Sequence, residues 1–218
     1  DGEKIKESKV VTKERVWKGK QEVKDLLLDF IATEPNEKKD TIMEVSVWKA
    51  LFRKKVFDEY DISFVSERQF ISEDVIFDID YLSKCNCVVA IPEPVYFYCV
   101  NPNSLSKVFR TDRFNKVKKL YKEILKKLIP IYGEELSNRR GDRFLIARAR
   151  TNARQIIRHE KIIGKNKMMK ALHNICEDQD MNEIFQRYPI HLLPLKYRLV
   201  AYLMKYRCYH LLKIILGR

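Results

Sequence analysis

Apolar residues recur at helical spacing near the start of the chain and throughout its second half. In the segment 20–33, Val23, Leu26, Leu27 and Phe30 fall on one side of a helix, and the polar run that follows ends it. Beyond residue 101 the same spacing predicts four further helices, over 112–129, 142–163, 165–177 and 194–216. The second half of the chain is therefore expected to be helical throughout.

The segment between these regions mixes helical and β-rich patterns. A helix is expected over 44–60 and a short strand with a loop over 61–70. The expected helix places Val47, Ala50, Leu51 and Phe57 inward and Lys49, Arg53 and Lys54 outward. Two β-rich runs follow, 88–91 and 95–100, separated by prolines that confine the break to a bend or a sheet edge. The pattern predicts an α/β region over 1–107 and a helical region over 108–218.

Charge is divided unevenly between these two regions. Residues 1–100 contain 16 Lys and Arg against 20 Asp and Glu, and residues 101–218 contain 27 against 10, so the net charges are −4 and +17. A basic field of that size attracts polyanions such as nucleic acid, anionic lipid headgroups or pyrophosphate-bearing substrates. No zinc-finger, helix-turn-helix or RNA-binding signature accompanies it, so nucleic acid is not the favoured partner.

The cysteines and the apolar runs favour a cytoplasmic protein. Five cysteines, an odd number, lack the two-residue spacing of zinc or redox motifs, so reduced thiols are expected. The apolar runs are far shorter than the ~20 residues that cross a bilayer, and no signal-peptide pattern opens the chain. The four histidines are scattered and belong to no metal motif.

The stretch FISEDVIFDIDYL, residues 70–82, places four acids among aromatic and aliphatic residues. Ser72 is a good N-cap residue, and Glu73 and Asp74 in the first helical turn would interact favourably with the helix dipole. Asp74 also shares a helical face with Asp78 and two aromatic residues, an environment that suits a general base. The acids therefore have two interpretations, a helix start and a site that accepts a proton.

The region from Val47 to Lys107 resembles the C-terminal portion of the catalytic domain of bacterial glycosyltransferase family 2. Four pieces carry the resemblance in order: VWKALFRKKVF, ISEDVIFDIDYL, PEPVYFY and NPNSLSK. The resemblance implies an α/β fold with a partial GT-A-like mixed sheet, followed by the helical region. It also implies inverting transfer of a sugar from a nucleotide-sugar donor to a hydroxyl of a glycan or lipid-linked acceptor in cell-surface polysaccharide biosynthesis.

The family's E-D pair carries over to Glu73 and Asp74. The resemblance implies that Asp74 deprotonates the acceptor and that Glu73 is its neighbour and a further acceptor contact. Arg68, Lys49 and Arg53 are candidates for contacts to the acceptor or to a phosphate. Each of these three is equally compatible with a solvated surface charge.

The sequence departs from the family in its acidic motifs. Asp78 and Asp80 match the D-x-D pattern that holds a divalent ion in such enzymes, but residues two apart on a helix point about 200° from each other and cannot share a metal. No metal ligand is therefore assigned in this chain. The resemblance implies that Mg²⁺ or Mn²⁺ is held mainly by a nucleotide-binding half preceding Asp1, and that this chain alone is incomplete and inactive.

Four arginines form a basic stripe on the predicted helix 142–163. Arg143, Arg150, Arg154 and Arg158 fall within about 80° of one another around the helix axis. Such a stripe is either a solvated face or a landing surface for anionic lipid at the inner face of the plasma membrane. The alternative function is accordingly a non-catalytic basic module that binds an anionic membrane or another polyanion.

Overall fold

The protein is mostly helical. The computed structural model describes residues 11–44, 46–97, 99, 110 and 112–217. Helix makes up 64% of the described residues, which form ten α-helices, two short 3-10 helices and one sheet of two strands. The expected GT-A-like mixed sheet is therefore wrong, because these residues contain no such sheet.

The two strands come from distant parts of the sequence. Strand β1 (Arg15–Lys18) pairs antiparallel with β2 (Cys87–Ala90), and Trp17 lies opposite Val88. The expected run at 88–91 thus forms a strand, but residues 61–70 and the described residues 95–97 form none. Pro92 and Pro94 lack the amide donors that a ladder needs. A β-rich composition does not by itself supply partner strands, so the sheet stays two strands wide.

Helix α1 (Lys20–Ile31) follows β1 through a tight turn. Gly19 has a φ of +92°, which favours glycine, and its N–H donates to the carbonyl of Asn86 at 2.8 Å. The turn therefore fixes α1 against the start of β2. The predicted inward residues Val23, Leu26 and Leu27 are buried, which confirms the helical pattern.

The expected helix over 44–60 is wrong. A 3-10 turn, η1 (Val47–Lys49), and a short helix, α2 (Lys54–Tyr60), form instead, and Leu51 between them is fully exposed at 104%. The N–H of Arg53 donates to Tyr81 Oη at 2.7 Å. Because this tertiary contact uses an amide that a continuous helix would need, the chain is extended between η1 and α2.

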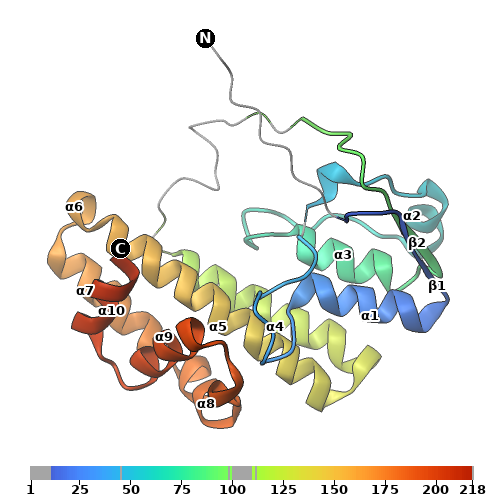
Figure 1. Ribbon diagram of the computed structural model, residues 1–218. Helices are drawn as coiled ribbons and strands as arrows, with labels where there is room; N and C mark the ends of the chain where they lie inside the picture. Colours follow the sequence, from blue (N-terminus) through green and yellow to red (C-terminus); the bar gives the residue numbers. More distant parts are fainter. Residues whose placement is uncertain (1–10, 45, 98, 100–109, 111, 218) are drawn as a thin grey trace.

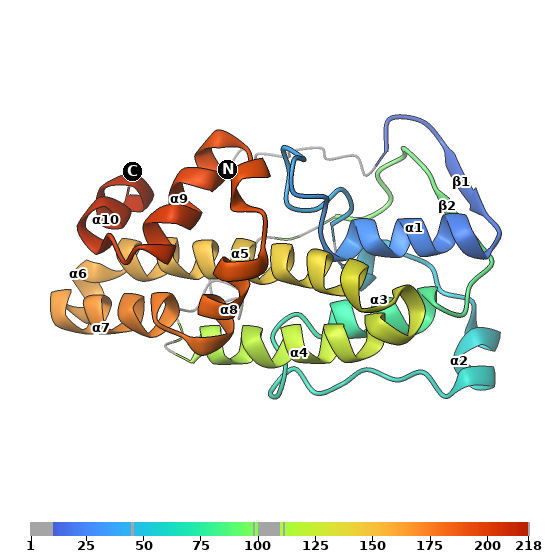
Figure 2. The ribbon, with the colours of Figure 1, turned by 90° about the horizontal axis from the view of Figure 1, so that it is seen from below.

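Two long helices form the centre of the molecule. Helices α4 (Arg113–Tyr132) and α5 (Glu134–Arg158) run side by side and are joined at Gly133, whose φ is +77° (Figures 1 and 2). A Cβ at Gly141 would lie 2.6 Å from Leu125 Cδ2. Glycine at this position therefore permits the close approach of α4 and α5.

Six smaller elements pack around the C-terminal half of α5, at the end of the molecule opposite the sheet (Figure 1). They are α6 (Glu160–Ile163), α7 (Lys165–Cys176), α8 (Gln179–Arg187), η2 (Ile190–Leu192), α9 (Leu195–Lys205) and α10 (Tyr209–Gly217). The helix expected over 194–216 is divided near Arg207, which has a φ of +58°. Helix α8 was not expected from the sequence, although the side chain of Asp178 caps it by accepting from the N–H of Met181.

Helix α3 (Asp74–Leu82) lies between α1 and α4. Its residues are buried almost throughout, and its apolar side chains belong to one hydrophobic core that extends to α10. Within the described part of the chain, no helix has both the length and the apolar character that crossing a bilayer requires.

Candidate functional site

The candidate site is the N-terminal end of α3. Asp74 is the first residue of the helix and is half-buried, with Glu73 immediately before it. The carbonyl of Ser72, rather than its hydroxyl, accepts a hydrogen bond from the N–H of Val75 at 3.1 Å. The prediction of a side-chain cap by Ser72 is therefore wrong, since the helix starts without one. Ser72 instead adopts a left-handed backbone with a φ of +61°.

Asp78 lies one turn further along the same face and is buried, with 5% of its surface exposed. Burial and the negative charge of Asp74 together raise the pKa of this carboxyl to about 7, although the charge of Lys49 opposes them. The Oδ2 atom of Asp78 is buried without a hydrogen-bond partner among the described residues. Asp78 can therefore hold or release a proton near neutral pH.

Lys49 faces inward, in contrast to the predicted outward position. Its side chain is 18% exposed, and its Nζ atom lies 3.9 Å from a carboxylate oxygen of Glu44. Burial lowers the pKa of Lys49, while the charges of Glu44 and Asp78 raise it. The structure thus brings Lys49 toward the acids of α3, as expected for a site residue, but on their buried side.

Aromatic rings cover the face of α3 that carries Asp78. Phe52 lies 5.0 Å from both Phe77 and Tyr81 in edge-to-face contacts, and Phe64 stacks on Phe77 at 4.2 Å between ring centroids. The face that the sequence placed opposite the core is therefore packed as well. Glu73 and Asp74, at the start of α3, are only half-buried, so a carboxylate of this segment stays accessible to water.

The two other predicted arginines lie outside this cluster. Arg53 is exposed immediately before α2, and Arg68 is exposed in the turn before Phe70. Among the described residues, no ion pair or hydrogen bond joins either guanidinium to the acids of α3. The structure does not bring Arg53 or Arg68 to Asp74.

The acids of α3 do not fit a divalent metal ion. Asp80 forms an ion pair with Lys127 at 2.7 Å, and Asp78 is buried beside Lys49 on another side of the helix. Over the described ranges, no group of three or more His, Cys, Asp or Glu residues could hold a metal. Neither Mg²⁺ nor Mn²⁺ therefore has a site on these residues.

The prediction of a continuous basic stripe on α5 is wrong, because two of the four arginines lie inside the protein. Arg143 is 1% exposed and forms an ion pair with Asp40 at 3.2 Å. Arg150 contacts the same carboxylate and lies 3.9 Å above the ring of Tyr197. Asp40 belongs to a segment that covers this part of α5, so both charges are neutralised inside the protein. Arg154 and Arg158 are exposed, as predicted.

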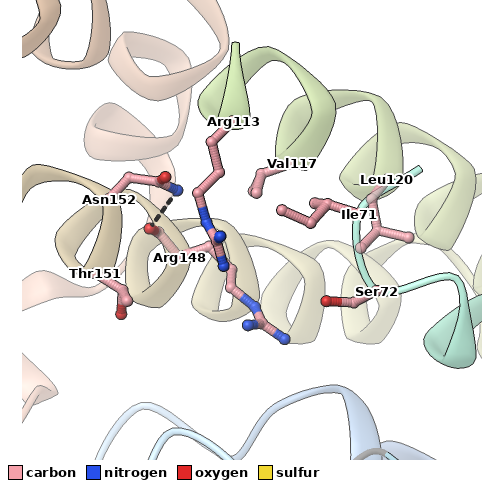
Figure 3. Close-up of a pocket in the computed structure, with 8 residues that line it drawn as sticks. All are labelled: Ile71, Ser72, Arg113, Val117, Leu120, Arg148, Thr151 and Asn152. Atoms are coloured by element: carbon pink, nitrogen blue, oxygen red, sulfur yellow. Dashed lines mark hydrogen bonds between the residues drawn. The ribbon is translucent and has the colours of Figure 1, made fainter. Parts of the chain in front are cut away.

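A small cavity that sequence reasoning missed lies beside Ser72. Arg113 from α4 and Arg148 from α5 line it together with Ser72, Thr151 and Asn152 (Figure 3). The available signal was the position of Arg148 between the buried residues Ala147 and Ala149, where a solvated arginine is not expected.

Comparison with known proteins gives no further assignment. No protein-family model, no curated protein and no solved structure matches this chain. The resemblance to glycosyltransferase family 2 therefore depends on the sequence motifs alone.

Proposed function

We propose that this chain supplies the acceptor-side part of an inverting glycosyltransferase, with Asp74 as the general base. The observation that carries the proposal is the pair formed by Asp74, half-buried at the start of α3, and Asp78, buried one turn away with a pKa near 7. The same short segment carries the E-D pair of the sequence resemblance.

The two carboxyls differ in exposure and would therefore have different roles. Asp78, with a pKa of about 7, holds a proton for a large part of the time near neutral pH, and Asp74 is the more exposed carboxyl of the pair. The acceptor hydroxyl would donate its proton to a carboxylate oxygen of Asp74 as its own oxygen bonds to the anomeric carbon of the donor. The bond from that carbon to the diphosphate would break on the opposite side, which inverts the configuration.

The described residues provide neither a metal site nor a recognised nucleotide site. A Mg²⁺ or Mn²⁺ ion would stabilise the leaving diphosphate, and the nucleotide-sugar donor would need its own pocket. The proposal therefore requires other residues to bind both. Glu73, adjacent to Asp74 and half-buried, is the nearest candidate for a contact with the acceptor.

Asp74→Asn in the full natural protein tests the proposal. We expect sugar transfer from a panel of nucleotide sugars to fall by about 100-fold or more, because Asn keeps the shape of Asp but accepts no proton. Asp58→Asn, which removes a carboxylate from exposed α2, is the matched control and should leave the rate unchanged. Wild-type transfer by a folded Asp74→Asn protein would exclude Asp74 as the base.

The alternative function, a basic module for an anionic membrane or another polyanion, has less support. Arg143 and Arg150 are held by Asp40, so only Arg154 and Arg158 of the four arginines present their charge to solvent. Peripheral contact with a membrane stays a prediction for that exposed pair.

A further inference from the structure

Two arginines meet in the cavity beside Ser72 without a negative partner. Figure 3 shows Arg113 reaching from α4 and Arg148 from α5 toward the segment that carries Ser72. The cavity has a volume of about 10 Å³, room for about one water molecule. Both arginines are only half-buried, so a larger group could contact them from the cavity mouth.

Neither guanidinium forms an ion pair or a hydrogen bond with any described residue. The contact of Arg148 within the protein is with the ring of Phe144, 5.1 Å from the guanidinium carbon. The negative charge of Asp40 raises the pKa of Arg148, but the Asp40 carboxylate forms its ion pairs with Arg143 and Arg150. Buried charges in proteins are usually paired or hydrogen-bonded. Among the described residues, the guanidiniums of Arg113 and Arg148 are neither, so they retain donors for an anionic ligand.

The electrostatic environment favours an anion. Burial lowers the pKa of Arg148, and the positive charge of Arg113 lowers it further. Burial likewise lowers the pKa of Arg113, with a second contribution from the charge of Arg110. Positive charges therefore act on both arginines, although the charge of Asp40 raises the pKa of Arg148, and a bound anion would relieve the repulsion.

The polar groups around the arginines match a phosphate. Two guanidinium forks can donate paired hydrogen bonds to phosphate oxygens, and the hydroxyl of Ser72 makes no hydrogen bond to a described residue. Thr151 and Asn152 are already engaged with backbone carbonyls of α5, so they shape the wall instead. Carboxylates are absent from the residues that line the cavity.

We propose that Arg113, Arg148 and Ser72 form a binding site for a phosphate or diphosphate group. The site joins α4, α5 and the segment before α3, and Ser72 precedes Asp74 by two residues. The inference goes beyond the transferase proposal and does not depend on it, because it concerns binding alone.

Titration calorimetry with inorganic phosphate and pyrophosphate tests this site at physiological ionic strength. We expect pyrophosphate to bind the wild-type protein, and Arg148→Gln and Arg113→Gln each to weaken binding at least about tenfold. The matched controls are Arg154→Gln and Arg158→Gln, which remove the same charge from the exposed surface of α5 and should bind as the wild type does. An equal loss in the controls, or no pyrophosphate binding by the wild type, would overturn the proposal.

Thermal unfolding separates a lost site from a lost fold. Pyrophosphate should raise the Tm of the wild type and the controls but not that of Arg148→Gln or Arg113→Gln. Without ligand, the two site variants should unfold at or above the wild-type Tm, because each removes one of the repelling positive charges. If Arg148→Gln fails to fold because its contact with Phe144 is lost, the result for Arg113→Gln decides.

Vesicles distinguish a lipid headgroup from a soluble phosphate. Vesicles of phosphatidic acid expose a phosphate monoester, whereas phosphatidylserine vesicles present a diester and a carboxylate. Selective binding to phosphatidic acid that Arg148→Gln abolishes would identify a lipid source. Binding of soluble pyrophosphate with no Arg148-dependent vesicle binding would identify a soluble one.

Discussion

Two buried aspartates in different regions of the molecule have opposite surroundings. Asp142 on α5 is 2% exposed and accepts hydrogen bonds from Tyr121 at 2.8 Å and from Arg187 at 2.7 Å through two of its nitrogens. Asp78 on α3 is almost as buried, yet one of its oxygens has no partner among the described residues. The first carboxylate is fully compensated, and the second is not.

The arginines of α5 repeat this contrast within one helix. Arg143 is paired with Asp40 and also donates to the carbonyls of Pro35, Glu37 and Lys39. Arg148, five residues later, forms no ion pair with a described acid, and the charge of Arg113 lowers its pKa. The difference separates charges that are paired within the fold from charges that can still bind a ligand or a proton.

The largest expected effect is on the compensated carboxylate. Asp142→Ala should lower the free energy of unfolding by about 3 kcal/mol, because Tyr121 and Arg187 both lose their acceptor. Urea unfolding measures this loss. The matched control, Asp180→Ala in the first turn of α8, should cost less than about 1 kcal/mol, because Asp180 is only half-buried and its nearest ion-pair partner, Lys122 at 3.1 Å, is largely exposed. If both variants lose the same free energy of unfolding, Asp142 is no more important to the fold than Asp180.

Arg143 gives the next largest effect. Arg143→Gln should lower the free energy of unfolding by about 2 kcal/mol, because the segment over α5 loses its ion pair with Asp40 and three carbonyl contacts. Arg154→Gln, exposed on the same helix, should change it by less than about 0.5 kcal/mol. If the two variants unfold alike in urea, Arg143 behaves as the solvated stripe residue that the sequence predicted.

The helices were the predictable part of this fold. Helices α1, α4 and α7 agree with the sequence pattern to within a few residues, because each has one apolar side that faces the shared core. The helix expected over 44–60 failed because the amide of Arg53 bonds to Tyr81, 28 residues away. The prediction of a mixed sheet failed because a β-rich sequence pattern does not indicate how many partner strands will pair with it.

The candidate site was predictable in position but not in environment. Helical spacing correctly placed Asp74 and Asp78 on one face, yet it could not show that Phe52 and Phe64 pack on Phe77 from outside the helix or that Asp78 is buried. Helical spacing also gave the positions of Arg143 and Arg150 around the helix axis, but it could not show that the segment around Asp40 covers them. Periodicity describes one element, whereas burial and pairing depend on what packs against it.

The uncompensated carboxylate predicts a smaller effect that depends on pH. The folded-state pKa of Asp78 is about 7, whereas that of an unfolded aspartate is about 4. Between these values the folded protein holds a proton that the unfolded chain has lost. The free energy of unfolding should therefore fall as pH rises from about 4 to 7, by at most about 1.4 kcal/mol per pH unit, and this contribution should then become constant.

Asp78→Asn isolates that contribution, because asparagine does not titrate. Burial also raises the pKa of Asp29, which adds a slope of the same sign to both proteins, so the difference between their unfolding curves belongs to Asp78. We expect the variant to gain stability relative to the wild type as pH rises through this range, in urea unfolding at successive pH values. A difference that stays constant with pH would mean that Asp78 titrates as an ordinary aspartate, and the contrast with Asp142 would then lie in packing alone.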